Sequence, residues 1–176
     1  MTSVRRAETA DAGPLAALAE RTFRDAFAES NNPVDMEIHC RERFSAEVQA
    51  REIADPGWVT LLAEADDRLI GFAQVRLNAP KDCVPARRPA ELYRIYVASP
   101  WHGQGIAPKL MDEVLAVAAQ DGSDRIWLGV WEENRRALAF YRKYGFEVVG
   151  AHEFWFGTER QQDLVMATAV RDAGIA

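Results

Sequence analysis

Apolar residues recur at a helical spacing in the first part of the chain and then at the alternating spacing of strands. Leu15, Leu18 and Phe23 lie on one helical stripe, with Thr9 and Asp11 suited to cap its start. Helices are expected at 12–28, from Pro33 onward, and from Ser45 to the breaker Asp55-Pro56-Gly57. Strands are expected at 3–7, 58–64 and 69–77, and the last two form a hairpin around Asp66-Asp67.

The second half of the chain alternates between strand and helix patterns. Strands are expected at 91–97, 125–130, 147–156 and 162–169, and helices at 134–144 and from the glycines of 103–107. Residues 78–90 contain three prolines and are expected to form a loop. Repeated strand–helix–strand units call for a partly parallel sheet covered by helices, and the hairpin adds antiparallel strands. We therefore predict an α/β or α+β protein with a mixed sheet, built as one domain over residues 1–176.

Composition narrows the class of protein. The chain has 176 residues, of which 48% are hydrophobic and 27% charged, as in an ordinary globular domain. No apolar run approaches the ~20 residues that span a bilayer, and the first residues lack the apolar core of a signal peptide. A cytoplasmic protein with no membrane partner is expected. The tryptophans are expected mainly in the core or packed on the sheet.

Charge and ligand-forming residues exclude further classes. The formal charge of −6 disfavours nucleic acid as a partner and suits a cationic small substrate. Cys40 and Cys83 indicate no disulfide framework and are expected to be inert. The three histidines have no cysteine or carboxylate at ligand spacing, so no metal site is expected.

A glycine-rich turn follows the strand at 91–97. Pro100 turns the chain, and Gly103, Gly105 and Ala107 open an amphipathic helix. Backbone N–H groups converge at such a helix start and can bind a phosphate or pyrophosphate. A dinucleotide fingerprint is disfavoured by Pro108, and the Gly-Lys-Ser/Thr of a Walker loop is absent. A purely structural turn remains the alternative.

A second motif lies downstream and identifies a family. Asn134, Ala137, Tyr141, Gly145 and Phe146 complete the pattern Asn-x-x-Ala-x-x-x-Tyr-x-x-x-Gly-Phe. Together with the glycine turn, the chain resembles the GNAT superfamily of acetyl-CoA-dependent N-acetyltransferases over residues 3–168, most strongly over 91–147. That family places Arg or Gln at the first position of the turn, where this chain has His102.

Within the superfamily the chain is similar to the PaiA-type polyamine acetyltransferases. The similarity is carried by Thr22-Phe23-Arg24-Asp25-Ala26-Phe27, Asn32-Pro33-Val34-Asp35-Met36, Glu91-Leu92-Tyr93-Arg94-Ile95-Tyr96-Val97, Ile126-Trp127-Leu128-Gly129-Val130-Trp131-Glu132 and Asp163-Leu164-Val165-Met166. The resemblance implies a mixed central sheet of about seven strands flanked by helices. It implies that 91–147 binds the co-substrate acetyl-CoA and performs catalysis, while the helical segment 12–53 shapes the acceptor site.

The resemblance also implies direct transfer of acetyl to an amine. Tyr141 is expected to protonate the departing thiolate, since a phenol with a pKa of ~10 can donate toward a thiolate whose acid has a pKa of ~8.5. Packing on the helix beside Tyr144 is its alternative role. Glu91 is the candidate base, alone or through a water chain, and an exposed strand-end glutamate is the alternative. Tyr93 is a candidate substrate or proton contact.

The residues expected at acetyl-CoA are Ile95, Tyr96, Val97, His102, Gly103, Gln104, Gly105, Ile106, Ala107, Asn134, Ala137 and Lys143. Backbone groups of 95–97 would grip the pantetheine arm like an added strand and polarise the acetyl carbonyl. Asn134 would cap its helix and approach that arm. An N–H of His102 could meet a phosphate oxygen. Arg135, Arg136 and Lys143 either meet the 3′-phosphate or form a solvated cationic face.

The acceptor is the least constrained part of the prediction. Glu29, Asp35 and Glu37 lie where this family usually builds its acceptor site, and carboxylates beside aromatic faces suit a polyammonium chain. Exposed acidic helix residues are the alternative. We expect an N-acetyltransferase acting on a small primary amine, with a polyamine favoured. A protein N-terminal or lysine acetyltransferase, a non-catalytic acetyl-CoA-binding regulator, and a homodimer remain open.

Overall fold

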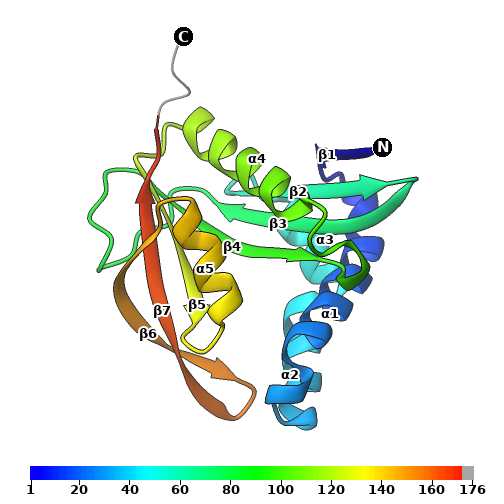
Figure 1. The fold of residues 1–176 in the computed structure, drawn as a ribbon. Coiled ribbons are helices and arrows are strands. Elements are labelled where there is room, and N and C mark those ends of the chain that lie inside the picture. Colours follow the sequence, from blue (N-terminus) through cyan, green and yellow to red (C-terminus); the bar gives the residue numbers. More distant parts are fainter. Residues whose placement is uncertain (172–176) are drawn as a thin grey trace.

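The computed structural model describes residues 1–171, which form one seven-stranded sheet in the order β1-β2-β3-β4-β5-β7-β6 (Figure 1). Only β4 and β5 pair in parallel, and the other neighbours are antiparallel. The predicted mixed sheet is therefore confirmed. The strands are β1 Thr2–Arg6, β2 Trp58–Ala65, β3 Arg68–Arg76, β4 Pro89–Val97, β5 Arg125–Trp131, β6 Glu147–Phe156 and β7 Glu159–Ala169.

Helices cover both faces of the sheet. On one face lie α1 Ala12–Phe27, α2 Pro33–Phe44 and α3 Ala46–Ala54, and on the other α4 Ile106–Gln120 and α5 Arg135–Lys143 (Figure 1). Short 3-10 turns occupy Thr9–Asp11, Ala28–Ser30 and Ser99–Trp101. Side-chain caps fix where three helices begin, because Asn32, Ser45 and Asn134 each accept a bond from a backbone N–H of the first turn.

Alternation along the strands supplies a separate core for each face. Leu61 packs in the cluster beneath α4, with Leu110 and Val114, whereas its neighbour Leu62 packs in the cluster beneath α1, with Leu15. The centre of the sheet is thereby buried on both faces. Close packing on these two faces holds β4 and β5 in fixed positions.

The central parallel pair separates partway along its length. Strands β4 and β5 pair through Pro89–Arg125, Ala90–Ile126 and Glu91–Trp127 and no further, while β4 continues alongside β3 to Val97. A bulge in the β3–β4 ladder, opposite Gln74 and Val75, leaves Tyr93 as an extra residue. The remainder of β4 diverges from β5, so a gap opens between two adjacent strands in the middle of the sheet.

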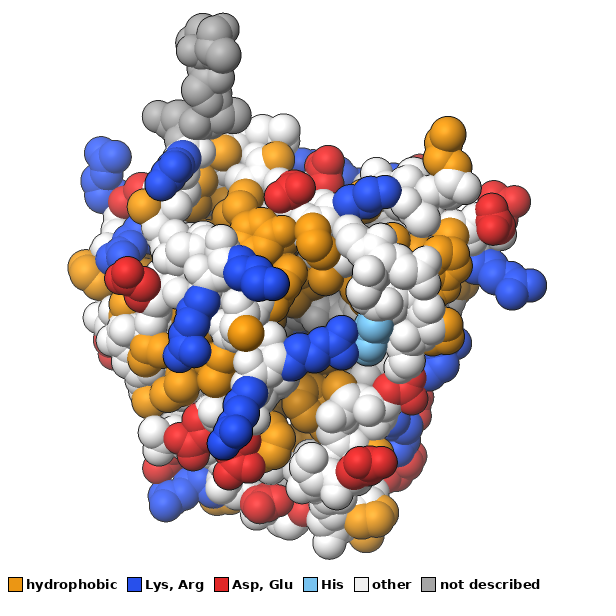
Figure 2. Space-filling model, in the orientation of Figure 1, with side chains coloured by type: hydrophobic (Ala, Val, Ile, Leu, Met, Phe, Trp, Pro, Cys, Tyr) orange, Lys and Arg blue, Asp and Glu red, His pale blue; other side chains and the backbone are white. Residues whose placement is uncertain are grey.

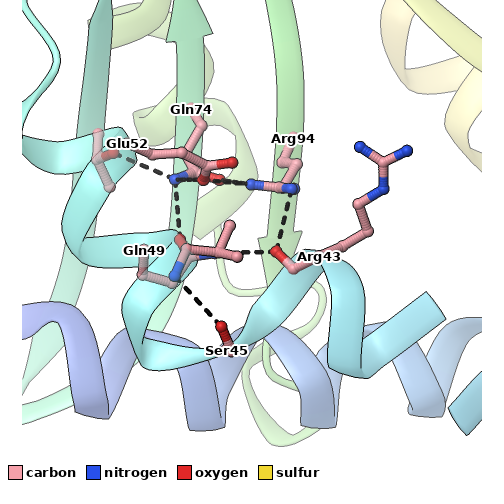
Figure 3. A network of polar contacts seen from close by, with 8 residues as sticks. Arg43, Ser45, Gln49, Glu52, Gln74 and Arg94 are labelled. Atoms are coloured by element: carbon pink, nitrogen blue, oxygen red, sulfur yellow. Dashed lines mark hydrogen bonds and ion pairs between the residues drawn. The ribbon is translucent and has the colours of Figure 1, made fainter. Parts of the chain in front are cut away.

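A buried polar network holds β4 to β3 and to the α2–α3 connection (Figure 3). Nη1 of Arg94 donates to Glu52 Oε2 and to Gln74 Oε1, each at 2.6 Å. Gln74 Nε2 donates to Gln49 Oε1 at 3.0 Å, and Arg94 Nη2 donates to the backbone carbonyl of Arg43 at 3.3 Å. The carbonyl that ends α2 and the carboxylate on α3 thus converge on one guanidinium, a network that the sequence pattern did not predict.

The elements otherwise follow the prediction, with local differences. β4 begins at Pro89, inside the segment expected to be a loop, and β7 begins at Glu159. Trp127 is buried, with Nε1 donating to the Ala79 carbonyl at 2.8 Å, as a core residue should be. The expectation of packing is wrong for Trp155, which is 61% exposed near the β6–β7 turn. In the part of the chain described, no helix combines the length and apolar character needed to cross a membrane.

Replacing Arg94 with Met is expected to lower the free energy of unfolding by about 3 kcal/mol, because it leaves the Glu52 carboxylate without its buried partner. Arg51→Met is the matched control, since Arg51 is an exposed residue of the same helix as Glu52 and such surface changes stay within about 0.5 kcal/mol. Urea unfolding followed by tryptophan fluorescence measures both. Equal stabilities for the two variants would contradict this role of the network.

Candidate active site

The gap between β4 and β5 opens into a cavity of about 1210 Å³. Its walls come from α1, the separated part of β4, the turn that follows it, α5, and the strands β5, β6 and β7. Figure 2 shows this face hollowed near its centre, with lysine or arginine side chains and a histidine at the rim. The basic residues that line the cavity on the α5 side are Arg135, Arg136 and Lys143.

The glycine turn forms one end of the cavity. Gly103 and Gly105 have φ of +76° and +79°, a left-handed conformation that residues with a side chain rarely adopt, and Gly105 caps the start of α4. A Cβ added at either glycine would meet nothing within 4 Å, so the backbone there faces open space. Exposed N–H groups at a helix start, beside three cationic side chains, fit the pyrophosphate and 3′-phosphate of a coenzyme A group.

His102 contributes differently from what the sequence predicts. Its Nε2 donates to the Val97 carbonyl at 2.8 Å, and its Nδ1 accepts from Arg136 Nη1 at 3.2 Å. Both ring nitrogens are occupied by protein, so the expected contact between a His102 N–H and phosphate is not formed in this arrangement. The imidazole instead bridges the end of β4 to the first turn of α5. The anion contacts therefore fall to the backbone and to the cationic side chains.

Most residues predicted to bind acetyl-CoA line the cavity together. They are Ile95, Tyr96, Val97, His102, Gly103, Gly105, Ile106, Ala107, Asn134, Ala137 and Lys143. Gln104 is the exception: its side chain donates to the Pro100 carbonyl at 2.9 Å and lies outside the lining. Asn134 Oδ1 accepts from the N–H of Ala137 at 3.2 Å, so the predicted capping of α5 is confirmed.

Tyr141 lies on the α5 side of the gap. The side chain lines the cavity and packs against Phe140 and Phe146. Burial raises the pKa of Tyr141 above its usual range. The phenol therefore stays protonated at neutral pH and is available as a proton donor.

Glu91 and Tyr93 lie where the two strands begin to part. Glu91 is buried at the last paired position, which excludes the alternative of an exposed strand-end residue, and its carboxylate accepts from Arg76 Nη1 at 3.0 Å. Burial raises the pKa of Glu91, and the charge of Arg76 opposes that shift. Tyr93 also lines the cavity, with the guanidinium of Arg94 4.6 Å from its ring centroid.

The carboxylates predicted to meet the acceptor do not line the cavity. Asp35 is buried elsewhere, where its carboxylate accepts from the N–H of Thr158 at 2.8 Å and from the Thr158 hydroxyl at 2.9 Å. It fastens α2 to the turn of the β6–β7 hairpin. Glu29 is exposed on the 3-10 turn after α1, and Glu37 forms an ion pair with Arg24 at 2.7 Å. Glu29 and Asp35 are therefore not supported as acceptor ligands.

Other residues form the wall on the α1 side of the sheet, and sequence reasoning missed them. Asp163 of β7 and His152 of β6 face each other across the hairpin and line the cavity beside Phe154, and α1 contributes Asp25. Phe27 packs edge-on against Trp131 with ring centroids 6.5 Å apart. The sequence contained a signal for this pairing. In a hairpin, residues at equal distances from the turn lie opposite each other, and the turn at Gly157-Thr158 places 152 opposite 163. Across the residues described, no group of three or more histidine, cysteine or acidic side chains is arranged to hold a metal ion.

Comparison with known proteins agrees with this geometry. The sequence matches the acetyltransferase (GNAT) family over residues 18–146. The chain belongs to that family. It is 36% identical over 156 residues to an uncharacterized N-acetyltransferase of Mycobacterium tuberculosis, covering 89% of this chain and 96% of the relative. As a GNAT member it is an acyltransferase that uses acetyl-CoA as its acyl donor.

Solved structures share the fold. The PaiA N-acetyltransferase of Thermoplasma acidophilum, crystallised with coenzyme A, superimposes with a TM-score of 0.77 at 23% identity, covering 96% of this chain and 99% of the other. The ribosomal-protein-S18-alanine N-acetyltransferase of Escherichia coli gives 0.71 at 18% identity, covering 99% and 97%. At these identities the likeness establishes the fold alone.

Gly105→Ala is expected to raise the Kd for coenzyme A about tenfold, since left-handed backbone costs a residue with a side chain roughly 1–2 kcal/mol. The turn would relax away from this conformation, and binding would have to restore it. Gly122→Ala is the control, because Gly122 has a similar φ of +76° and open surroundings but lies at the far end of α4. Calorimetric titration should find the affinity lost in the first variant and kept in the second. Equal affinities would remove the turn from the binding site.

Proposed function

We propose that this enzyme transfers acetyl from acetyl-CoA directly to a primary amine of a small cationic acceptor, with a polyamine as the favoured substrate class. The observation that carries the proposal is the two-sided cavity. One side ends in a glycine turn flanked by arginines, and the other in carboxylates among aromatic rings. An anionic donor and a cationic acceptor would each meet complementary charge, with the β4–β5 gap between them.

On the donor side, acetyl-CoA supplies an activated thioester and residues 91–147 supply its site. The N–H groups of 103–107 and the side chains of Arg135, Arg136 and Lys143 bind the phosphates. The β4 edge at 95–97, which has no strand partner on the β5 side, hydrogen-bonds the pantetheine arm. A backbone N–H of that edge would also polarise the acetyl carbonyl as its oxygen gains charge.

Tyr141 is the proposed proton donor to the departing thiolate. Its hydroxyl lies on the α5 wall of the gap, and its raised pKa keeps the proton in place until the sulfur can take it. Neither cysteine offers an acyl-enzyme route, because Cys40 is buried in α2, where burial raises the pKa of its thiol to about 11. Neither Cys40 nor Cys83 lines the cavity. Direct attack by the amine fits these positions.

On the acceptor side, the segment 12–53 and the β6–β7 hairpin form the wall. The carboxylates available to an ammonium group are Asp25 and Asp163, in place of the Glu29 and Asp35 expected from the sequence. The aromatic rings of Phe27, Trp131 and Phe154 suit the methylene segments and charges of a polyamine.

A thiol-release assay with acetyl-CoA and a panel of polyamines, amino acids and peptides tests the proposal. Polyamines are expected to give the highest kcat/KM. Acetylation of peptides without activity on spermidine would instead indicate a protein N-terminal or lysine acetyltransferase. Binding of acetyl-CoA with no acceptor turned over at all would indicate a regulator.

Tyr141→Phe is expected to lower kcat about 100-fold, the low end of what a positioned proton donor contributes, and to leave the affinity for acetyl-CoA unchanged. The matched control is Tyr144→Phe, since Tyr144 follows directly after the same helix and lies outside the cavity lining. Steady-state kinetics and calorimetric titration separate the two effects. Unchanged turnover in Tyr141→Phe would assign it to packing.

A further inference from the structure

Asp163 is a largely buried carboxylate that lacks a cationic partner in the protein. Its side chain retains 14% of its surface, and the nearest basic atom that the described residues offer is His152 Nε2 at 3.9 Å. Burial lowers the pKa of His152, so the imidazole is neutral at neutral pH and supplies no balancing charge. A buried carboxylate without a counter-charge is costly, and such groups cluster at sites that bind or react with a ligand.

Other shielded carboxylates of the described chain have partners. Asp35 is bonded to Thr158, Glu52 to Arg94, and Glu91 to Arg76. Asp163 differs from all three because its carboxylate lines the cavity with neither an arginine nor a backbone N–H bonded to it. Beside it, Nδ1 of His152 is buried without a hydrogen-bond partner among the residues described. The described residues therefore supply no hydrogen-bond partner for His152 Nδ1 and no counter-charge for Asp163.

The glycine that β5 carries at this point lets His152 and Asp163 lie close against the strand. A Cβ added to Gly129 would lie 3.0 Å from His152 Cε1 and 3.4 Å from Asp163 Oδ2. Any side chain at position 129 would press on both groups, so the glycine keeps them free on the cavity side of the sheet. The aromatic ring of Trp131, two residues along the same strand, also lines the cavity.

Asp163 also lies within reach of the catalytic gap. Tyr96 of β4 lines the same cavity with Tyr141, and burial raises the pKa of Tyr96, with the charge of Asp163 adding to the shift. One phenol on β4 is thus within electrostatic range of the proposed proton donor on the α5 side and of Asp163 on the α1 side. Glu91 also lines the cavity, but it lies where the strands are still paired and its carboxylate is engaged by Arg76.

We propose that Asp163 binds the ammonium group of the acceptor and takes one proton from it, so that the free amine can attack the acetyl carbon. This inference rests on the proposed function. The nitrogen lone pair forms the C–N bond and the C–S bond breaks with its electron pair on sulfur. The phenol of Tyr141 gives that sulfur its proton, and the second proton lost by nitrogen restores the phenol. The proton held by Asp163 leaves to solvent through the cavity, which returns the enzyme to its starting state.

The electrostatics of the site suit this role. Burial raises the pKa of Asp163 to about 6, so the carboxylate is ionised at neutral pH yet more basic than an exposed aspartate. The titratable groups facing it are His152 from β6 and Tyr96 from β4, while β5 presents the uncharged Gly129 and Trp131. Lys81, from the loop before β4, acts on His152 and helps to keep it neutral.

The test is the pH dependence of kcat/KM in Asp163→Asn, measured with the amine that the native enzyme acetylates fastest in the panel. The native profile is expected to fall below about pH 6 as Asp163 becomes protonated. Asp163→Asn should lose about 100-fold at pH 7. Its rate should then climb steadily toward the acceptor's own pKa of ~10.4, with acetyl-CoA affinity unchanged.

Two matched variants complete the experiment. Glu153→Gln removes an exposed carboxylate next to His152 on the same strand, where it pairs with Arg160, and should reproduce the native profile. Glu91→Gln tests the base expected from the sequence. It should keep the fall of kcat/KM at low pH that the native enzyme shows. The assignment is overturned if Asp163→Asn leaves the pH profile of kcat/KM unaltered. It is also overturned if the fall of kcat/KM at low pH is lost in Glu91→Gln but not in Asp163→Asn. If the native enzyme acetylates peptides and Asp163→Asn shows the expected effect, a polyamine acceptor is refuted but Asp163 remains the base. If the native enzyme acetylates no amine, both the proposed function and the role of Asp163 are refuted.

Discussion

Strands β4 and β5 stop pairing after Glu91 and Trp127, although both continue for several residues. Backbone N–H and C=O groups that would have bonded across the pair are left facing a cavity, which costs free energy unless something else satisfies them. The separation persists because β4 keeps its ladder to β3 and because the buried Arg94 is held by Glu52 and Gln74. The free-energy cost of the gap is therefore offset by these interactions elsewhere in the fold.

In the proposed reaction, the two sides of that gap recognise their ligands by different means. The donor side relies on backbone geometry at Gly103 and Gly105, supported by cationic side chains of α5. The acceptor side relies on side chains carried by separate elements, among them Asp163 and Trp131. A donor site made by backbone geometry does not depend on any one side chain. The side chains of the acceptor site lie on several elements and can be substituted one at a time. The donor side of the cavity is thus locally basic, although the chain as a whole has a net charge of −6.

Local signals predicted most of the fold. Caps, breakers and hydrophobic spacing located each helix and strand to within a few residues, and the seven-stranded mixed sheet followed from the family resemblance. Most residues predicted to bind acetyl-CoA line one cavity, because they fall in two short stretches of sequence, 95–107 and 134–143. Tyr141 and Asn134 lie on one short helix whose motif can be recognised without knowing its neighbours.

The acceptor site was not predictable in this way, because its geometry depends on contacts between distant segments. Asp35 seemed available for a substrate only because its partner Thr158 lies 123 residues later. In the sequence Asp163 stands out only as part of a segment that resembles the family, and its proposed role depends on which face of β7 it occupies and on the absence of a side chain at Gly129. His102 was assigned to phosphate because its bonds to Val97 and Arg136 are invisible in the sequence.

The bond between Asp35 and Thr158 has a consequence for the order in which the molecule is assembled. Closing so long a loop is entropically costly and slow compared with forming local turns. During synthesis, helix α2 leaves the ribosome long before the hairpin that fastens it has been translated. The glycine turn and α5 are also complete before that hairpin exists. The proposed amine pocket is therefore completed only after the segments that form the proposed acetyl-CoA site have been translated.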